Sequence, residues 1–191
     1  MRTGRLEAFT DGVVAIIITI MVLELRVPDG ADWHSLQASL PIFLAYVLAY
    51  VNVGLYWNNH HHLLHAAERV DGRVLWANLF LLFWLSLVPF VIRWVDGTGF
   101  TPLPTAAYGV VLGMAGIGYS VLTRALLSAN GPDSPLRAAI GRDWKGKSSI
   151  ALYGVAIAVA FVAPAISIGI YVAIAAMWFV PDRRIEARVQ S

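Results

Sequence analysis

Long apolar segments, separated by short polar loops, constrain this chain more than any other feature. Hydrophobic residues make up 58% of the 191 residues and charged residues only 14%, with a mean hydropathy of +0.66. A helix needs about 20 apolar residues to cross a bilayer, and it satisfies its backbone hydrogen bonds internally. The sequence therefore predicts an all-α membrane protein, with apolar helices over residues 5–25, 33–57, 73–95 and 105–128 and a last apolar block at 149–180.

The last apolar block is too long for one helix across a membrane. At about 1.5 Å per residue, its 32 residues would reach roughly 48 Å, whereas the hydrocarbon core is about 30 Å thick. Pro164 interrupts helical hydrogen bonding near the middle of the block, so we predict two spans, at 149–163 and 165–180. The chain is thus predicted to cross the membrane six times as a single domain, 1–191, since no loop is long enough to fold alone.

The basic residues support an even number of crossings. If the N-terminus is cytoplasmic, twelve of the fourteen Lys and Arg side chains lie on the cytoplasmic side, and only Arg26 and Arg93 lie outside. Loops rich in Lys and Arg remain in the cytoplasm. Both termini are therefore predicted to be cytoplasmic. Because topology also accounts for the basic pI of 9.1, no nucleic-acid partner is expected.

The first apolar helix has one face of particular interest. At about 100° per residue, the residues Gly12, Ile16, Thr19, Ile20 and Leu23 fall in one stripe. The stripe is apolar apart from a single hydroxyl. Such a stripe can contact lipid or pack inside a helix bundle, or it can form a hydrophobic constriction that gates a pore by dewetting. The residues alone leave these interpretations open.

Polar residues gather where the first three helices meet the cytoplasmic side of the membrane. Ionisable groups near hydrocarbon are costly and usually face protein or water. Asp11 can accept hydrogen bonds from histidine, Trp76 or Asn78, and Arg5 can donate to carbonyl or amide oxygens. We predict a structural network that locks the first helix against the second and third, formed by Arg5, Asp11, Trp57, His60, His61, Trp76 and Asn78.

Two other interpretations of the histidines remain open. His61 and His65 have the i, i+4 spacing of zinc ligands on a helix, although a third and a fourth ligand are not evident. Histidine also titrates near neutral pH, so the cluster can act as a proton relay. The sequence has no cysteine, phosphate-binding loop, nucleophile elbow or pair of carboxylates within a span. We therefore expect neither an enzyme nor a resident cofactor or metal.

Three short motifs of this chain resemble those of a known family. They are Arg-x-x-x-Phe-Ser-Asp-Gly before an apolar helix, Trp-x-x-His-His at the end of the second helix, and an asparagine on the third. The combination resembles the transmembrane protein 175 family of potassium channels, in particular its prokaryotic members with a single repeat. The matching positions are Arg5, Phe9, Thr10 (in place of the usual Ser), Asp11, Gly12, Trp57, His60, His61 and Asn78.

The resemblance implies a homotetramer around one axial pore, which the first helix of each subunit lines. Ile16, Ile20 and Leu23 match the positions of the constriction, and Thr19 matches a hydroxyl layer that helps potassium. The resemblance also implies that the Arg and Asp of the first motif bond with His and Asn of neighbouring helices. Ala15 stands where some animal members carry a serine, which implies modest selectivity for potassium over sodium.

The predicted function is a weakly to moderately potassium-selective cation channel in the plasma (inner) membrane of a prokaryote. Its partners are copies of itself and the lipid bilayer, and potassium is the permeant ion. One alternative is a proton-permeable pore or proton-coupled transporter that uses His60, His61 or Asp11. Others are a small membrane enzyme or non-conducting protein that binds metal through its histidines, and an assembly subunit without flux.

Overall fold

The structure is a computed structural model that describes residues 3–140 and 144–179, and its regular elements there are all helices. They are α1 (Thr3–Leu23), α2 (Trp33–His65), α3 (Gly72–Ser86), α4 (Val88–Thr98), α5 (Pro102–Asn130), α6 (Pro135–Ile140), α7 (Trp144–Ala160) and α8 (Pro164–Phe179). Some residues that entered the predictions lie outside the described residues. They are Val180, the end of the last apolar block, and five of the arginines counted on the cytoplasmic side, namely Arg2, Arg142, Arg183, Arg184 and Arg188.

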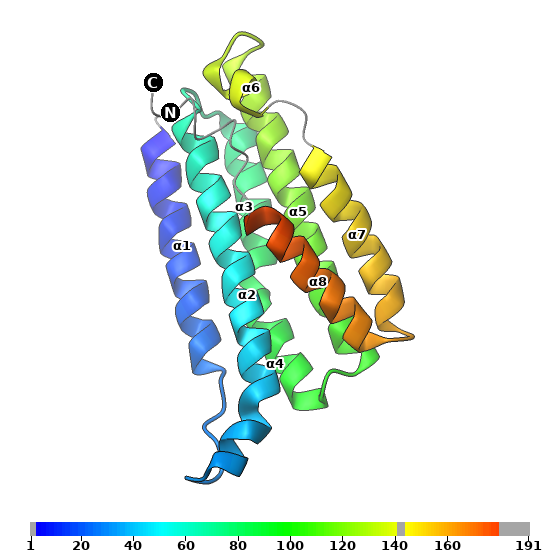
Figure 1. Cartoon of the computed structure of the whole chain (residues 1–191). Helices are drawn as coiled ribbons and strands as arrows, with labels where there is room; N and C mark the ends of the chain where they lie inside the picture. The colour runs from blue at the N-terminus through cyan, green and yellow to red at the C-terminus, as the bar shows by residue number, and fades with distance from the viewer. Residues whose placement is uncertain (1–2, 141–143, 180–191) are drawn as a thin grey trace.

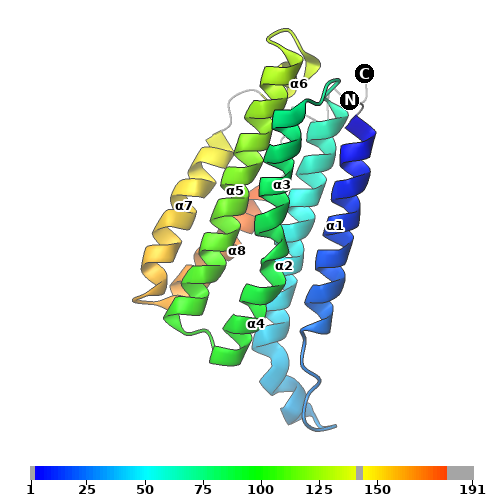
Figure 2. The same cartoon turned by 180° about the vertical axis from the view of Figure 1, so that it is seen from behind.

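The long helices run up and down one bundle, with α1 at one edge and α7 at the other (Figure 1, Figure 2). α5 lies in the middle and packs against α3, α4, α7 and α8. α1 packs against α2, α3 and α4, and it begins at the end of the bundle that also carries α6 (Figure 1). This edge position leaves one side of α1 without cover from the other described helices.

Four helical stretches of the described residues are long and apolar enough to cross a bilayer, namely Thr3–Leu23, Trp33–His65, Gly72–Thr98 and Pro102–Asn130. α7 and α8 are shorter and form an antiparallel pair, joined by a turn between Ala160 and Pro164. Pro164 occupies the first position of α8, where its missing N–H costs no helical bond. The chain is an all-α membrane protein with several apolar helices.

α2 continues past the predicted end at Trp57 to His65, so the histidines lie on the helix rather than beyond it. The residues after Trp57 are polar, but they include no Gly or Pro that would break the helix. At the other end, Asp32 caps α2 by accepting a 2.7 Å hydrogen bond from the backbone N–H of Ser35. This bond lowers the pKa of Asp32 below its usual value.

The third predicted span consists of two helices. α3 ends at Ser86 and α4 begins at Val88, because Pro89 has no N–H to offer the carbonyl of Leu85 and its ring crowds that carbonyl. α4 ends at Gly99, whose φ of 64° gives a left-handed cap. α4 therefore lies as a separate element beside the far end of α1.

Glycines on α5 make room for aromatic rings and for another helix. A Cβ at Gly109 would collide with the hydroxyl of Tyr171, and a Cβ at Gly113 would lie 3.2 Å from the Cβ of Tyr153. The close packing at these two glycines is thus made with tyrosines of α7 and α8. Gly118 lies instead against the backbone of α3, where a Cβ would be 3.0 Å from the Cα of Leu81.

The stretch 130–148, between two of the predicted apolar segments, contains helical residues at two places. The Ser134 hydroxyl accepts a hydrogen bond from the first turn of α6, and Pro135 opens that helix, as proline does at a first helical position. α7 begins at Trp144 rather than at residue 149.

Candidate functional site

α1 has one face covered by its own chain. The covered residues recur every three or four positions and face α2, α3 and α4; they are Leu6, Thr10, Val14, Ile17 and Met21. In a bilayer such packing acts mainly through van der Waals contact, since lipid is as apolar as these side chains. The covered face fixes the rotation of α1 about its own axis, and so determines which residues point away from the subunit.

The open face of α1 is the stripe that the helical spacing predicted. Ile16 is 60% exposed, Ile20 is 42% exposed and Leu23 is 77% exposed, and Gly12 and Thr19 are exposed as well. A continuous apolar face of this kind, at the edge of a subunit, is covered either by lipid or by another chain. The geometry thus fits contact of the stripe with lipid and a place of the stripe in a pore between chains. It excludes packing of the stripe against the other described residues of the same subunit.

Thr19 is the polar residue of the stripe. Its hydroxyl donates a 2.7 Å hydrogen bond to the carbonyl oxygen of Ala15, one turn earlier on α1. A hydroxyl oxygen also has two lone pairs that accept. Because the proton is used within the helix, the lone pairs of the Thr19 oxygen remain available on the open side of α1.

Three buried side chains join the first three helices near the start of α1. Asn78 on α3 donates through Nδ2 to Thr10 Oγ1 on α1 at 3.0 Å, and its Oδ1 lies 2.8 Å from Nε2 of His60 on α2. All three residues are at most 2% exposed. Since an amide oxygen only accepts, Nε2 of His60 carries the proton in this bond. Nδ1 of His60 is buried and has no partner among the described residues.

Two more hydrogen bonds extend this contact between α1 and α2. Trp57 Nε1 donates to Asp11 Oδ1 at 2.8 Å, and His61 Nδ1 lies 2.7 Å from Glu7 Oε1. The bonding residues occupy positions 7, 10 and 11 on α1 and positions 57, 60 and 61 on α2. This i, i+3, i+4 spacing places each set on one face of its helix. We call this set the proximal cluster; it comprises Glu7, Thr10, Asp11, Trp57, His60, His61 and Asn78.

Two residues predicted for this network lie outside it. Trp76 is 75% exposed and takes no part in the proximal cluster. The donor to Asp11 is Trp57, and not histidine, Trp76 or Asn78, which were the donors considered from the sequence. Trp76 and Asn78 are two positions apart, which places them on different sides of α3. Arg5 is exposed and forms no hydrogen bond or ion pair within the part of the chain that the structure describes.

The other motif residues have distinct surroundings. Phe9 is 51% exposed, and Gly12 has open space where a Cβ would lie. Glu7 was missed by motif-based reasoning, although its position one turn before Asp11 on the same face is a usable signal.

The rings of His61 and His65 stack with centroids 5.7 Å apart. In residues 3–140 and 144–179, no group of three or more potential metal ligands occurs.

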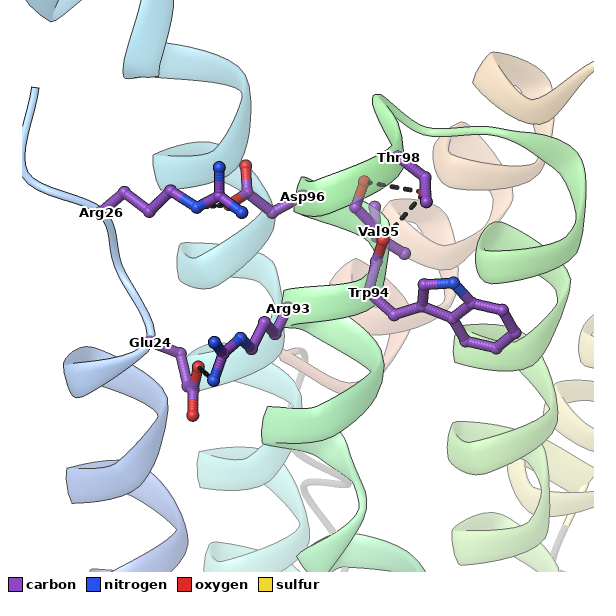
Figure 3. A network of polar contacts seen from close by, with 7 residues as sticks. All are labelled: Glu24, Arg26, Arg93, Trp94, Val95, Asp96 and Thr98. Carbon is purple, nitrogen blue, oxygen red and sulfur yellow. Dashed lines mark hydrogen bonds and ion pairs between the residues drawn. The ribbon is translucent and has the colours of Figure 1, made fainter. Parts of the chain in front are cut away.

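At the far end of α1, two ion pairs connect the chain to α4 (Figure 3). Oε2 of Glu24, the residue after α1, lies 2.9 Å from Nη1 of Arg93, and Nε of Arg26 lies 3.4 Å from Oδ2 of Asp96. The two arginine side chains are mostly exposed, so water and salt screen both contacts. Thr98, nearby, bonds to carbonyl oxygens of its own helix. We call Glu24–Arg93 and Arg26–Asp96 the distal ion pairs.

These features define a class of protein, namely a multi-pass all-α membrane protein whose first helix has an open apolar face between two polar attachments. A family model described as the endosomal/lysosomal potassium channel TMEM175 matches residues 5–89, which include the whole proximal cluster. A potassium channel of Chryseobacterium sp. (strain P1-3) is 50% identical over 186 residues, which cover 97% of this chain and 97% of that protein. The chain belongs to the TMEM175 family, and the family predicted from the motifs is confirmed.

A solved structure supports the same relationship. The crystal structure of a lysosomal potassium-selective channel TMEM175 homolog from Chamaesiphon minutus superposes with a TM-score of 0.74 at 27% identity, and the match covers 93% of this chain and 96% of that one. The human relative is named an endosomal/lysosomal proton channel; it is 38% identical over 92 residues, which are 41% of this chain and 18% of that protein. Relatives thus carry the names of potassium and of proton channels.

Proposed function

We propose that the chain forms a homotetrameric, potassium-permeable cation channel in which α1 of each subunit lines a central pore. The observation that carries the proposal is the open apolar face of α1, which no other described part of the subunit covers. Family membership supports the choice of a pore over lipid contact, since the relative at 50% identity is named a potassium channel.

The proposal includes six membrane crossings, cytoplasmic termini and the plasma membrane of a prokaryote. The up-and-down order of α1, α2, the α3–α4 stretch, α5, α7 and α8 is consistent with six crossings (Figure 1). The excess of Lys and Arg in the loops on the side where the chain begins supports cytoplasmic termini. The bacterial sources of the similar potassium channels support the choice of membrane.

In the proposed pore, copies of Ile16, Ile20 and Leu23 form a narrow apolar neck. A cation that enters such a neck loses part of its water, and the apolar wall offers nothing in return, so the neck limits flux until it widens. The oxygen of Thr19 lies between these layers and partly replaces the lost water. Selectivity then rests on the different costs of dehydrating potassium and sodium, and it is modest because each subunit contributes one hydroxyl to the neck.

Ion flux from liposomes that hold the purified protein tests the proposal. Flux is measured under a potassium gradient and then under a matched sodium gradient. The proposal requires cation flux, with potassium ahead of sodium. Intact, folded protein that passes neither ion would overturn it.

A variant of the neck tests which helix lines the pore. Ile16→Asn should raise the potassium leak, because a polar side chain in the neck retains water. Ile166→Asn is the matched control, since Ile166 on α8 is 61% exposed and Ile16 is 60% exposed. The control should leave flux unchanged if α8 faces lipid. Equal flux in the two variants and the wild type, at equal expression, would remove Ile16 from the pore.

Proton conduction is the second candidate function. It is favoured by the names of the animal relatives and by the buried, unpartnered Nδ1 of His60 in the proximal cluster. The test is acidification of a dye inside liposomes under a pH gradient without potassium. His60→Gln keeps an N–H for the bond to Asn78 but cannot titrate. Potassium-independent proton flux that is lost in this variant would support the candidate, and wild-type protein without such flux would exclude it.

A further inference from the structure

A cavity of about 370 Å³ lies where α5 ends and α6 begins, at the end of the bundle where α1 starts (Figure 1). One wall is the last turns of α5, and the other is the connection to α6 together with α6 itself. Its lining residues are Arg124, Leu127, Ser128, Gly131, Pro132 and Arg137. Two cationic side chains from separate helices therefore face one small space.

The charge of this cavity is not balanced by carboxylates of the described chain. The three ion pairs formed within residues 3–140 and 144–179 involve neither Arg124 nor Arg137. Asp133, in the connecting turn, does not line the cavity. Two like charges that share a space repel each other, so an anion that enters between them lowers the free energy of the arrangement.

The packing of α5 on α3 gives the depth of the cavity in the membrane. The two helices run in opposite directions, and Gly118 lies against the backbone of Leu81. From this contact, six residues toward the α6 end of the bundle lead to Arg124 on α5 and to Leu75 on α3. Arg124 is therefore level with Leu75 and close in depth to Trp76. Trp76 is 75% exposed, and exposed tryptophans on spanning helices are typical of the headgroup layer. This register places Arg124 near the depth of lipid headgroups, and the other lining residues follow it toward the end of the bundle.

We propose that this cavity binds the phosphate group of an anionic membrane lipid, in the leaflet on the α6 side of the bundle. Guanidinium groups present planar pairs of N–H donors that match phosphate oxygens, and Arg124 and Arg137 bring two such groups together. The hydroxyl of Ser128 supplies a further donor. Basic pockets at the cytoplasmic face of spanning helices have the chemistry that anionic headgroups require. The inference concerns lipid recognition and does not depend on the pore.

The test is a lipid titration of the purified full chain in detergent, with the melting temperature as readout. Phosphatidylglycerol should stabilise the wild type in a saturable manner, and phosphatidylcholine should not. Arg124→Gln with Arg137→Gln should weaken the apparent affinity for phosphatidylglycerol about tenfold. The matched control is Arg69→Gln with Arg73→Gln, which removes the same charge from exposed arginines at the same end of the bundle.

Each outcome decides the proposal. Equal weakening in the two double variants would show general charge attraction and would overturn a defined site. Inorganic phosphate that stabilises the wild type as well as phosphatidylglycerol does would assign the cavity to a free anion and overturn the lipid assignment. If the glutamine variant does not fold, Arg124→Lys with Arg137→Lys keeps the charge but loses the planar donor pairs. Unchanged affinity in that lysine variant would contradict recognition by the guanidinium groups.

Discussion

The two ends of α1 are attached by contacts of different kinds. In the proximal cluster, Thr10, His60 and Asn78 are at most 2% exposed, and their bonds connect three helices. In the distal ion pairs, the arginine side chains are 67% and 72% exposed, so water reaches the cationic partner, whereas the carboxylates of Glu24 and Asp96 are 25% and 17% exposed. A buried polar group that loses its partner stays unsatisfied, whereas water replaces a lost partner at the surface. The difference predicts that α1 is held firmly at its start and weakly at its end.

The largest effect is expected at Asn78, which bonds to two helices at once. Asn78→Ala leaves Nε2 of His60 without an acceptor and Oγ1 of Thr10 without a donor, both in a buried site. We expect a loss of about 2 to 3 kcal/mol of stability. Thermal unfolding of the detergent-purified protein measures the loss as a lower midpoint, and size-exclusion chromatography measures it as a smaller fraction of the proposed oligomer.

Asn59→Ala is the control for this variant. Asn59 lies beside the proximal cluster on α2, but its side chain donates to the carbonyl of Leu55 on its own helix. Its loss should cost much less, because that carbonyl belongs to the helical ladder. If Asn59→Ala destabilises the protein as much as Asn78→Ala, the bonds between helices are not what fixes the start of α1.

The next effect is expected at Asp11, which is half-buried and accepts from Trp57. Asp11→Ala should cost about 1 kcal/mol and reduce the fraction of protein in the proposed oligomer. The potassium-to-sodium flux ratio of the remaining oligomer should not change, because Asp11 faces α2 rather than the open stripe. Trp57→Phe removes the same bond from the donor side and should match it. A stable oligomer with an altered flux ratio would contradict this structural role.

The proximal cluster also shows how far the sequence could go. The sequence brought Asp11, His60 and Asn78 to one place, because the topology sets their depth and ionisable groups near hydrocarbon seek partners. The exact partners depend on which way each helix face turns. Trp76 was one of three donors considered for Asp11, yet the i, i+2 offset from Asn78 directs it away from the bundle.

The helical spans were predicted better than their ends. The interruption at Pro164 follows from the backbone chemistry of proline and is visible in the sequence. The extension of α2 to His65 was not predicted, because hydropathy reports where apolar residues stop rather than where helical hydrogen bonds stop. The distal ion pairs were also missed. They depend on the separate helix α4, which starts after Leu87 because of Pro89.

A smaller effect is expected at the Glu24–Arg93 pair. Glu24→Gln and Arg93→Gln should each cost about 0.5 kcal/mol, and the cost should fall as salt rises. The exchanged pair, Glu24→Arg with Arg93→Glu, should recover most of the loss. Melting temperatures in low and high salt provide the measurement. Losses that do not depend on salt, or an exchanged pair no better than the single variants, would show that the two charges do not interact.

The smallest effect is expected at Arg26, whose contact with Asp96 is longer, at 3.4 Å, and whose side chain is 72% exposed. Arg26→Gln should change the melting temperature by an amount near the error of the measurement, equivalent to about 0.2 kcal/mol. Flux should respond more than stability if the loop after α1 positions Leu23 in the proposed neck. Potassium flux of Arg26→Gln in liposomes, compared at equal protein content, separates the two readouts. A large loss of stability would show that the distal end is held as firmly as the proximal cluster, and the contrast between the two ends of α1 would then be wrong.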